Sequence, residues 1–385
     1  MRRSTSRILT THVGSLPRPA ALADLLVRQE RSEKIDEERL RVEARAAVKY
    51  VVERQVAAGV DIINDGEQPR VGFQTYVPSR MAGFGGESQR PPPRDLAQYP
   101  EVFAMMARRF PSMAKISNAP QAVAPVRYDD LSAAREELAL FDEASAGAKA
   151  VERFMTAPSP GIIATTMLNA HYDSHEAYVF ALAGEMRKEY ELIAASGLVL
   201  QIDAPDLAME RSVLFQEKSL AEFIDIAHMH VAALNQALAA IPRDRVRLHC
   251  CWGNWEGPHV HDAPLIEILP VLYGANVEGL SIEFANPRHQ HELSALKARP
   301  LPDDRILLPG VLDTTTNYVE HPEVVADRIC AAVAAVGDPG RVIAGTDCGF
   351  GTFAGYEFLA PSVVWAKLAA CAQGAAIASA RLQWA

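Results

Sequence analysis

The chain has 385 residues, 49% of them hydrophobic, which is enough for a large core in one or two domains. Its 38 basic and 48 acidic residues give a formal net charge of −10, which argues against a nucleic-acid-binding surface. No segment approaches the roughly 18 apolar residues of a membrane span, and no apolar region follows the N-terminal arginines to form a secretion signal. Five cysteines without a regular framework suit a reducing compartment. We therefore expect a cytoplasmic protein with neither a nucleic-acid nor a membrane partner.

Strands and helices alternate along most of the chain. The sequence predicts strands over 8–13, 60–64, 161–168, 198–203, 247–251, 280–284, 306–313 and 342–347. It predicts helices over 20–32, 36–58, 175–196, 219–240, 263–275, 291–297, 321–336 and 361–380. Strands that are apolar on both faces are typical of a parallel sheet covered by helices, so we predict an α/β fold, a (β/α)8 TIM barrel. An open doubly wound sheet is the alternative, but no G-x-G-x-x-G motif follows the first strand.

Residues 74–160 interrupt this alternation. They contain the run Arg90-Pro91-Pro92-Pro93-Arg94, several turns and a helical stretch near 131–157. Long ordered connections are usually functional, so we predict an insertion after the second strand that forms a lid or an accessory hairpin. A peripheral structural decoration is the alternative. Residues 1–385 are then a single barrel that carries this insertion.

Side chains with catalytic or metal-binding chemistry gather at the predicted strand ends, where barrels of this kind carry their active sites. They are Ser15, Glu67, Asp203, His249, Cys251, Glu283, Asp313, Asp347 and Cys348. His249 and Cys251 lie two residues apart on one strand, so their side chains point in the same direction. Glu283 ends the sixth predicted strand and Cys348 the eighth, and strands five, six and eight lie near one another around a barrel. We therefore predict that His249, Cys251, Glu283 and Cys348 bind one Zn²⁺ ion.

This ligand set indicates a type of chemistry. Two thiolates, a carboxylate and a neutral imidazole give a zinc site a net charge of −1, which makes the metal a weak Lewis acid towards water. Such a site suits the binding of a substrate thiol as a thiolate, whereas a free thiol with a pKa of ~8.5 is mostly protonated at neutral pH. The set favours S-alkylation, and a zinc lyase or hydrolase is the alternative from another class.

Other candidates have simpler structural interpretations. Cys250, Cys330 and Cys371 suit buried small hydrophobic positions. His259 and His261 lie in the loop after the fifth predicted strand, where either could contact substrate, but loop histidines are more often solvated. Asp313 and Asp347 can serve as helix caps.

The segments His249-Cys250-Cys251, Ser281-Ile282-Glu283 and Asp347-Cys348-Gly349 resemble the zinc ligands of the catalytic domain of cobalamin-independent methionine synthase. The resemblance continues in order along nearly the whole chain, through Val13-Gly14-Ser15-Leu16-Pro17, Asp65-Gly66-Glu67, Gln201-Ile202-Asp203-Ala204-Pro205 and Pro309-Gly310-Val311-Leu312-Asp313. The duplicated N-terminal half of the long enzymes is absent, so the chain is identified as a short, single-barrel member.

The resemblance implies a role for each site residue. In the family, zinc activates homocysteine and the methyl group comes from methyl-tetrahydrofolate. By position, the backbone of Ser15 contacts the carboxylate of the amino acid, while Glu67 and Asp203 hold its ammonium. We further expect Asp313 or His12 to assist catalysis at the mouth of the site.

Three departures from the family pattern concern the donor. Ala204 stands where the family has a glutamate, Ala170 where a tryptophan stacks on the folate, and Thr315 where a histidine serves proton transfer. We therefore predict a zinc-dependent thiol alkyltransferase acting on homocysteine or a similar thiol, and leave the small-molecule alkyl donor and the oligomeric state open. The related epoxyalkane:coenzyme M transferases suggest folate-independent epoxide opening as the alternative, although coenzyme M lacks the ammonium that Glu67 and Asp203 suit.

Overall fold

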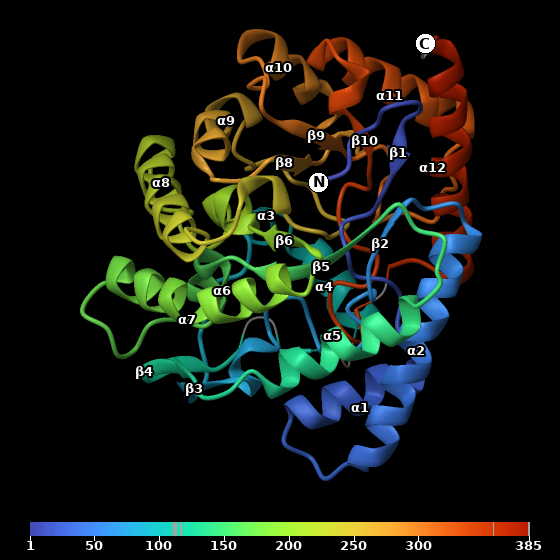
Figure 1. The fold of residues 1–385 in the computed structure, drawn as a ribbon. Coiled ribbons are helices and arrows are strands. Elements are labelled where there is room, and N and C mark those ends of the chain that lie inside the picture. The colour runs from blue at the N-terminus through green and yellow to red at the C-terminus, as the bar shows by residue number, and fades with distance from the viewer. Residues whose placement is uncertain (111–113, 116–117, 357, 384–385) are drawn as a thin grey trace.

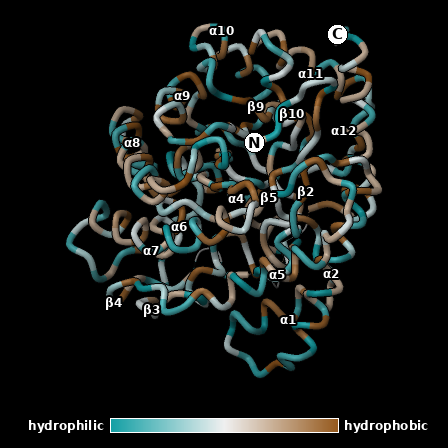
Figure 2. The backbone as a smooth tube through the Cα atoms, in the orientation of Figure 1, coloured by the Kyte–Doolittle hydropathy of each residue, from teal (hydrophilic) through white to brown (hydrophobic). Residues whose placement is uncertain are grey.

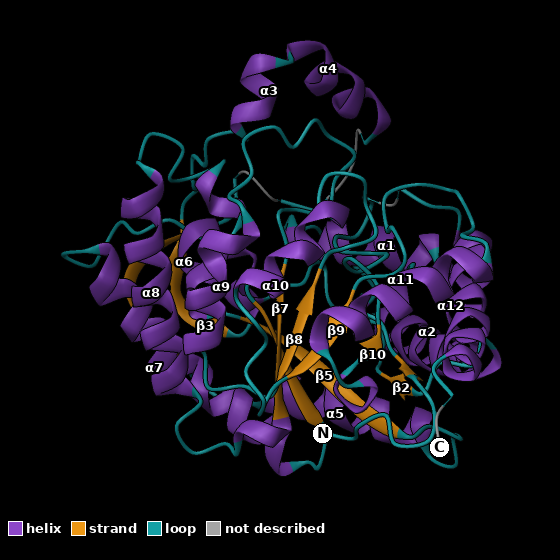
Figure 3. Ribbon diagram, turned by 90° about the horizontal axis from the view of Figure 1, so that it is seen from above, coloured by secondary structure: helices purple, strands orange, loops and turns teal. Residues whose placement is uncertain are grey.

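A curled parallel sheet forms the centre of the protein, and helices pack around its outer side (Figures 1 and 3). The computed structural model describes residues 1–110, 114–115, 118–356 and 358–383. Six strands pair in parallel in the order β2 (Ile62–Ile63), β5 (Glu152–Pro158), β6 (Val199–Asp203), β7 (Val246–Cys250), β8 (Gly279–Ile282) and β9 (Ile306–Pro309). Strands β1 (Leu9–Thr10) and β10 (Ile343–Ala344) form a second, two-stranded parallel sheet.

Short contacts bring the two sheets side by side. Parallel bridges join Leu307 to Val342 and Gly310 to Gly345, which places β10 next to β9. At the other edge, the Asp61 amide donates to the Thr10 carbonyl at 3.2 Å, which places β1 next to β2. The chain is thus a mixed α/β protein with a curled parallel sheet. A fully closed (β/α)8 barrel remains a prediction, because the hydrogen-bonded ladders of the two sheets are separate.

The interior of the curled sheet is filled with side chains. Because successive strand residues point to opposite faces, one set faces inward and the other packs against the helices. The inner apolar cluster consists of Leu9, Ile62, Phe154, Val199, Ile306, Leu308 and Ile343. Buried Arg247 lies above it, with its guanidinium 3.6 Å from the centre of the Phe154 ring and its Nε donating to Gln201 Oε1 at 2.7 Å. Burial lowers the pKa of Arg247 to about 9.

Side chains cap the free amides at the start of several of the surrounding helices. Asp36 accepts hydrogen bonds from the Glu38 and Arg39 amides at the start of α2, and Ser219 and Glu222 form a capping box at the start of α8. The α-helices that precede the insertion are α1 (Ala20–Glu30) and α2 (Glu37–Ala57). Those that follow strand β5 are α6 (Pro160–Thr166), α7 (His175–Ala195), α8 (Leu220–Ala237), α9 (Leu265–Gly274), α10 (Ala295–Ala298), α11 (Pro322–Val336) and α12 (Pro361–Arg381). Figure 2 shows hydrophobic colour at central strands such as β9 and hydrophilic colour on the connection between α1 and α2.

Helix α12 closes the fold beside α2 and α11 (Figure 1). Among the described residues it is the one helix with the length and composition to cross a membrane, and 50% of its most apolar window is buried inside the protein. Trp365 of α12 packs edge-on against Tyr50 of α2 with 6.0 Å between ring centres. The apolar residues of α12 therefore contribute to packing in the protein core.

The third strand of the sequence prediction is wrong. Residues 161–168 do not form a strand; helix α6 (Pro160–Thr166) begins there, with the Ser159 side chain accepting from the Ile162 amide. The parallel strand is β5, inside the stretch near 131–157 that was expected to be helical, and the helix of that stretch, α5, is limited to Ser132–Ser145. Every residue of α6 is buried, so the helix shows no polar face from which its period can be recognised. The insertion consequently ends before Glu152.

The insertion itself contains an antiparallel hairpin of β3 (Met81–Gly85) and β4 (Gln121–Tyr128), preceded by a short helix η1 (Val77–Ser79). Between the two strands, α3 (Arg94–Gln98) and α4 (Pro100–Arg109) stand away from the body (Figure 3). Asp95 accepts from the Val260 amide at 2.7 Å, and Arg109 pairs with Glu256 at 3.1 Å. Both partners lie in the loop after β7, so α3 and α4 cover the carboxyl end of the sheet.

Candidate active site

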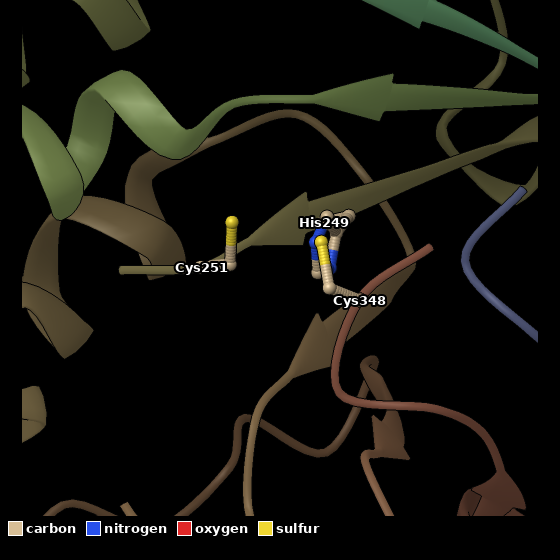
Figure 4. Close-up of side chains that lie close together, drawn as sticks. All are labelled: His249, Cys251 and Cys348. Atoms are coloured by element: carbon tan, nitrogen blue, oxygen red, sulfur yellow. The ribbon is translucent and has the colours of Figure 1, made fainter. Parts of the chain in front are cut away.

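Three of the predicted metal ligands converge at the carboxyl end of the sheet. His249 lies on β7, Cys251 follows this strand directly, and Cys348 lies in the loop after β10 (Figure 4). One ring nitrogen of His249 and the two Sγ atoms all lie within 4.8 Å of one another, and all three residues are buried. Both ring nitrogens of His249 lack a hydrogen-bond partner in the described part of the chain. A buried imidazole without a partner beside two thiols fits the donor set of a zinc site.

The two thiols of this group ionise differently. The hydrogen bond from Cys348 lowers the pKa of Cys251 well below its ordinary value, despite burial. The same hydrogen bond, together with burial, raises the pKa of Cys348 well above the usual range. Cys251 is therefore the cysteine of the pair that ionises first. Metal ligation by cysteine requires this ionised form.

Glu283 lies close to these residues but is not a member of the group within 4.8 Å. Its carboxylate accepts from Asn286 Nδ2 at 2.8 Å and from the Trp252 amide at 3.3 Å. Burial, followed by the negative charge of Cys251, raises the pKa of Glu283 well above its usual range. The structure thus brings Glu283 to the edge of the candidate metal centre, and its ligation of a metal remains a prediction.

A cavity of about 100 Å³ opens onto His249, Cys251 and Cys348 and is also lined by Ser15, Glu67 and Asp203. The three predicted substrate-binding residues therefore lie beside the candidate ligands. Glu67 adopts a left-handed backbone conformation with φ of 55°, directly after Gly66. This unusual backbone turns its side chain inward, where Oε1 accepts from Thr156 Oγ1 at 2.9 Å and Oε2 has no hydrogen-bond partner.

The two carboxylates of this cavity are costly to ionise together. Burial, and then the charge of Glu67, raises the pKa of Asp203 to about 8. Burial also raises the pKa of Glu67, against the opposing charges of Arg70 and Arg18. Asp203 Oδ1 accepts from Gln201 Nε2 at 2.7 Å. A cation entering between Glu67 and Asp203 would stabilise the ionised form of both.

A second cavity, of about 200 Å³, adjoins the first and shares Gly253, Asn254 and Cys348 with it. It is lined by Glu283, Asp347 and Asp313. Asp313 Oδ1 accepts from the Thr315 amide at 2.6 Å and the Thr316 amide at 3.2 Å, which makes it the cap of a turn at the mouth.

Asp347 organises the loop that follows β8. Its carboxylate accepts from three consecutive backbone amides, those of Phe284, Ala285 and Asn286, at 2.7–2.9 Å. Burial raises the pKa of Asp347 to about 6 in spite of these hydrogen bonds. Asp347 therefore positions the segment that also carries Glu283.

His12 does not reach either cavity. Its Nε2 lies 2.7 Å from Gln55 Oε1 of α2, and its ring packs edge-on against Phe154 with 5.5 Å between ring centres. Burial lowers its pKa to about 4. A catalytic role for His12 remains a prediction without support from this geometry.

Four further residues of the first cavity carried no clear signal in the sequence. Phe73, Met209 and Phe353 provide apolar walls, and Arg90 of the insertion enters from the side, where it pairs with buried Glu210. Phe73 and Phe353 lie 5.7 Å apart between ring centres. The sequence showed Arg90 only as part of a proline-rich run. Its place in the cavity could not be predicted, because its partner Glu210 lies 120 positions away along the chain.

The fold and the buried His–Cys–Cys group define an α/β enzyme with a candidate metal centre. The chain belongs to the family described as "Cobalamin-independent synthase, Catalytic domain", which matches residues 8–90 and 99–366; this is a family of methyltransferases. It is 25% identical over 343 residues to a methionine synthase of Thermococcus kodakarensis, covering 88% of this chain and 86% of the relative. It is 26% identical over 381 residues to a methionine synthase of Saccharolobus solfataricus, covering 97% and 96%.

Solved structures agree with this fold. A B12-independent methionine synthase from Shewanella sp. W3-18-1, in complex with selenomethionine, superimposes with a TM-score of 0.73 and 21% identity, over 98% of this chain and 99% of that one. A protein described as a putative vitamin-B12-independent methionine synthase from Listeria monocytogenes gives a TM-score of 0.65 at 20% identity, over 99% of both chains.

Proposed function

We propose that this protein is a zinc-dependent thiol methyltransferase that uses homocysteine or a similar amino-acid thiol as its acceptor in the cytoplasm. The observation that carries the proposal is one cavity with two kinds of lining. His249, Cys251 and Cys348 provide soft metal ligands at one side, and the buried carboxylates of Glu67 and Asp203 lie at another. Zinc bound to the cysteines would keep the acceptor sulfur as a thiolate at neutral pH.

The remaining residues of the cavity bind and orient the acceptor. The ammonium of an amino-acid thiol lies between Glu67 and Asp203, where it offsets the repulsion of the two carboxylates. The free Oε2 of Glu67 supplies a hydrogen-bond acceptor for it. The backbone at Ser15 faces the acceptor's carboxylate. This arrangement directs the thiol towards His249, Cys251 and Cys348. Holding the thiol in a reactive orientation reduces the entropic part of the activation barrier.

The donor occupies the apolar part of the same cavity. Phe73, Met209 and Phe353 offer flat and polarizable surfaces, and Arg90, which is paired with Glu210, forms a polar part of the wall. Ala170 contributes no ring and instead pairs its amide with the Ala122 carbonyl at 2.9 Å. These walls would take the place of the stacking tryptophan of the family, and the identity of the small-molecule alkyl donor stays open. The insertion that contains α3 and α4 acts as a lid over this end of the sheet.

Two alternatives fit these residues less well. Coenzyme M carries a sulfonate in place of an ammonium, and the carboxylates of Glu67 and Asp203 would repel it. A zinc lyase or hydrolase needs a metal that activates water, whereas two thiolate ligands reduce the Lewis acidity of zinc. The charge of the cavity therefore favours an amino-acid thiol over a sulfonated one.

Thiol binding to the cobalt-loaded protein tests the proposal. L-Homocysteine is compared with 4-mercaptobutanoate, which is the same molecule without the ammonium, and with coenzyme M. We expect homocysteine to increase the thiolate-to-cobalt absorption at the lowest concentration, and to bind at least tenfold more tightly than either analogue. Equal affinity for all three thiols, or no new sulfur ligand, would contradict the proposal.

A matched pair of variants locates the selectivity. Glu67→Gln and Asp203→Asn keep the size of each side chain and remove its charge, so they should reduce the preference for homocysteine over 4-mercaptobutanoate. Glu256→Gln, on the rim of the second cavity, should leave the preference unchanged. Product analysis with methyl-folate or an epoxide as donor then decides which alkyl group is transferred.

A further inference from the structure

Two histidines and an aspartate form a second cluster of possible metal ligands, separate from the His–Cys–Cys group. His259 and Asp262 lie in the loop after β7, and His289 lies in the loop after β8. Asp262 Oδ2 is 3.0 Å from His259 Nδ1 and 3.0 Å from His289 Nε2. One ligand atom of each residue lies within 4.8 Å of the other two. A single carboxylate oxygen thus faces two imidazole nitrogens at ligand-to-ligand spacing.

The hydrogen bonds of His259 restrict its protonation. Its outer nitrogen, Nε2, lies 3.1 Å from the Trp255 carbonyl oxygen. A carbonyl oxygen only accepts hydrogen bonds, so Nε2 carries the proton. In the neutral ring, Nδ1 then points a lone pair at the Asp262 carboxylate, which is repulsive. Either a second proton or a metal cation must lie between Nδ1 and Asp262.

His289 also directs one ring nitrogen at Asp262, and its other ring nitrogen faces a second carboxylate. Its Nδ1 lies 3.5 Å from Glu292 Oε2, while its Nε2 faces Asp262. The side chain is buried, and the Trp252 indole stacks on its ring with 3.9 Å between centres and 15° between planes. Metal-binding histidines almost always direct the other ring nitrogen to a carbonyl or a carboxylate, which fixes the tautomer and orients the ring. His259 meets this condition through the Trp255 carbonyl. His289 Nδ1 is directed at the Glu292 carboxylate but makes no hydrogen bond among the described residues.

We propose that His259, Asp262 and His289 bind a second divalent transition-metal ion. Two imidazoles and one carboxylate are the ligands of zinc and non-haem iron sites that retain open positions. His259 lines the 200 Å³ cavity, so water or a small ligand has access to such a position. The ion joins the loop after β7, which carries Cys251, to the loop after β8, which carries Glu283. It therefore stabilises the two loops that border the first site.

The competing explanation is a cluster of protonated histidines. Burial disfavours the charged ring, but the carboxylates of Asp262 and Glu292 raise the pKa of His289 to about 9. Similarly, Asp262 raises the pKa of His259 against the effect of burial. Two imidazolium rings between two carboxylates satisfy the same distances without a metal. The two explanations differ in metal content and in spectrum.

Cobalt titration of the chelator-treated full chain distinguishes them. A site of nitrogen and oxygen ligands gives cobalt ligand-field bands without the sulfur-to-cobalt charge-transfer band of a cysteine site. We expect wild type to bind one more Co²⁺ per chain than His289→Gln or Asp262→Asn, and both variants to keep the charge-transfer band. His261→Gln is the matched control, because His261 lies in the same loop but contacts Gln98 outside the cluster.

A variant of the His249, Cys251 and Cys348 centre separates this site from the proposed thiol site. Cys251→Ser should lose the charge-transfer band and keep the Co²⁺ that has only nitrogen and oxygen ligands. Equal Co²⁺ content in wild type, Asp262→Asn and His289→Gln would overturn the proposal and identify a protonated histidine cluster. X-ray absorption of wild type loaded with two equivalents of Co²⁺ supplies a measurement that does not depend on the folding of a variant. Absence of a second, sulfur-free cobalt environment there would also overturn it.

Discussion

Glu67 and Asp203 place two buried carboxylates in one cavity, and the charge of Glu67 adds to burial in raising the pKa of Asp203 to about 8. The two side chains come from segments 136 positions apart, at the ends of β2 and β6. Such a pair is unfavourable in the free protein. It becomes favourable when a cation is bound between the carboxylates.

The first prediction concerns protons released on ligand binding. L-Methionine carries the ammonium without a thiol, so its binding should ionise Asp203 and release protons at pH 7. In the free protein the pKa of Asp203 is raised to about 8, and methionine binds best when Asp203 is ionised. The affinity for methionine should therefore increase as the pH rises towards 8 and level off above it. Calorimetry at pH 7 in two buffers of different ionisation enthalpy measures the release. Asp203→Asn should abolish it, and an unchanged proton count in this variant would refute the assignment.

Removal of either cysteine of the first group should remove one metal ion per chain. Cys251→Ser and Cys348→Ser each eliminate a thiolate from a site whose ligand atoms lie within 4.8 Å. Metal analysis after extensive dialysis should show one zinc less per chain than wild type in both variants. Cys330→Ser, on α11 and outside both cavities, should retain the wild-type content. Retention of all the zinc by Cys251→Ser and Cys348→Ser would contradict the metal centre.

Comparison of variants at Glu283 and at its hydrogen-bond partner Asn286 tests whether Glu283 is a direct metal ligand. Asn286 Nδ2 donates to the Glu283 carboxylate at 2.8 Å, so Asn286→Ala should loosen that carboxylate and weaken metal affinity roughly 10- to 100-fold. Glu283→Gln removes the charge itself and should weaken affinity further. Competition with a coloured chelator measures both. An equal or smaller effect of Glu283→Gln would show that Glu283 only borders the site.

Gly310 determines the position of Asp347. A Cβ atom at residue 310 would lie 2.0 Å from Asp347 Oδ1, so Gly310→Ala must displace the carboxylate that holds the loop after β8. We expect a loss of about 1–3 kcal/mol in the free energy of unfolding, together with weaker metal binding. Gly184→Ala, within α7 and with nothing within 4 Å of the added Cβ, should instead gain up to about 1 kcal/mol. Denaturant titration compares the two, and equal stabilities would refute the steric argument.

The sequence by itself determined where much of the chemistry lies. Residues that end parallel strands meet at one edge of the sheet, so His249, Cys251 and Cys348 were predictable as neighbours, and so were Glu67 and Asp203. The alternation of strands and helices gave the α/β class for the same reason: a buried parallel strand and the helix that covers it are both local patterns. The strand at 152–158 was missed and α6 was assigned as a strand, because a helix buried on every side loses the polar face that reveals its period.

Only the tertiary structure decided which side chains are left without partners. The free Oε2 of Glu67, the unpaired ring nitrogens of His249 and the entry of Arg90 depend on contacts between distant segments. The sequence placed His259 in a loop, where solvation was the simpler expectation and contact with substrate the alternative. Instead, folding brings the loops after β7 and β8 together and places His259 and His289 on one carboxylate oxygen of Asp262. Residue type and strand position are local properties, whereas burial and hydrogen-bond satisfaction are properties of the assembled core.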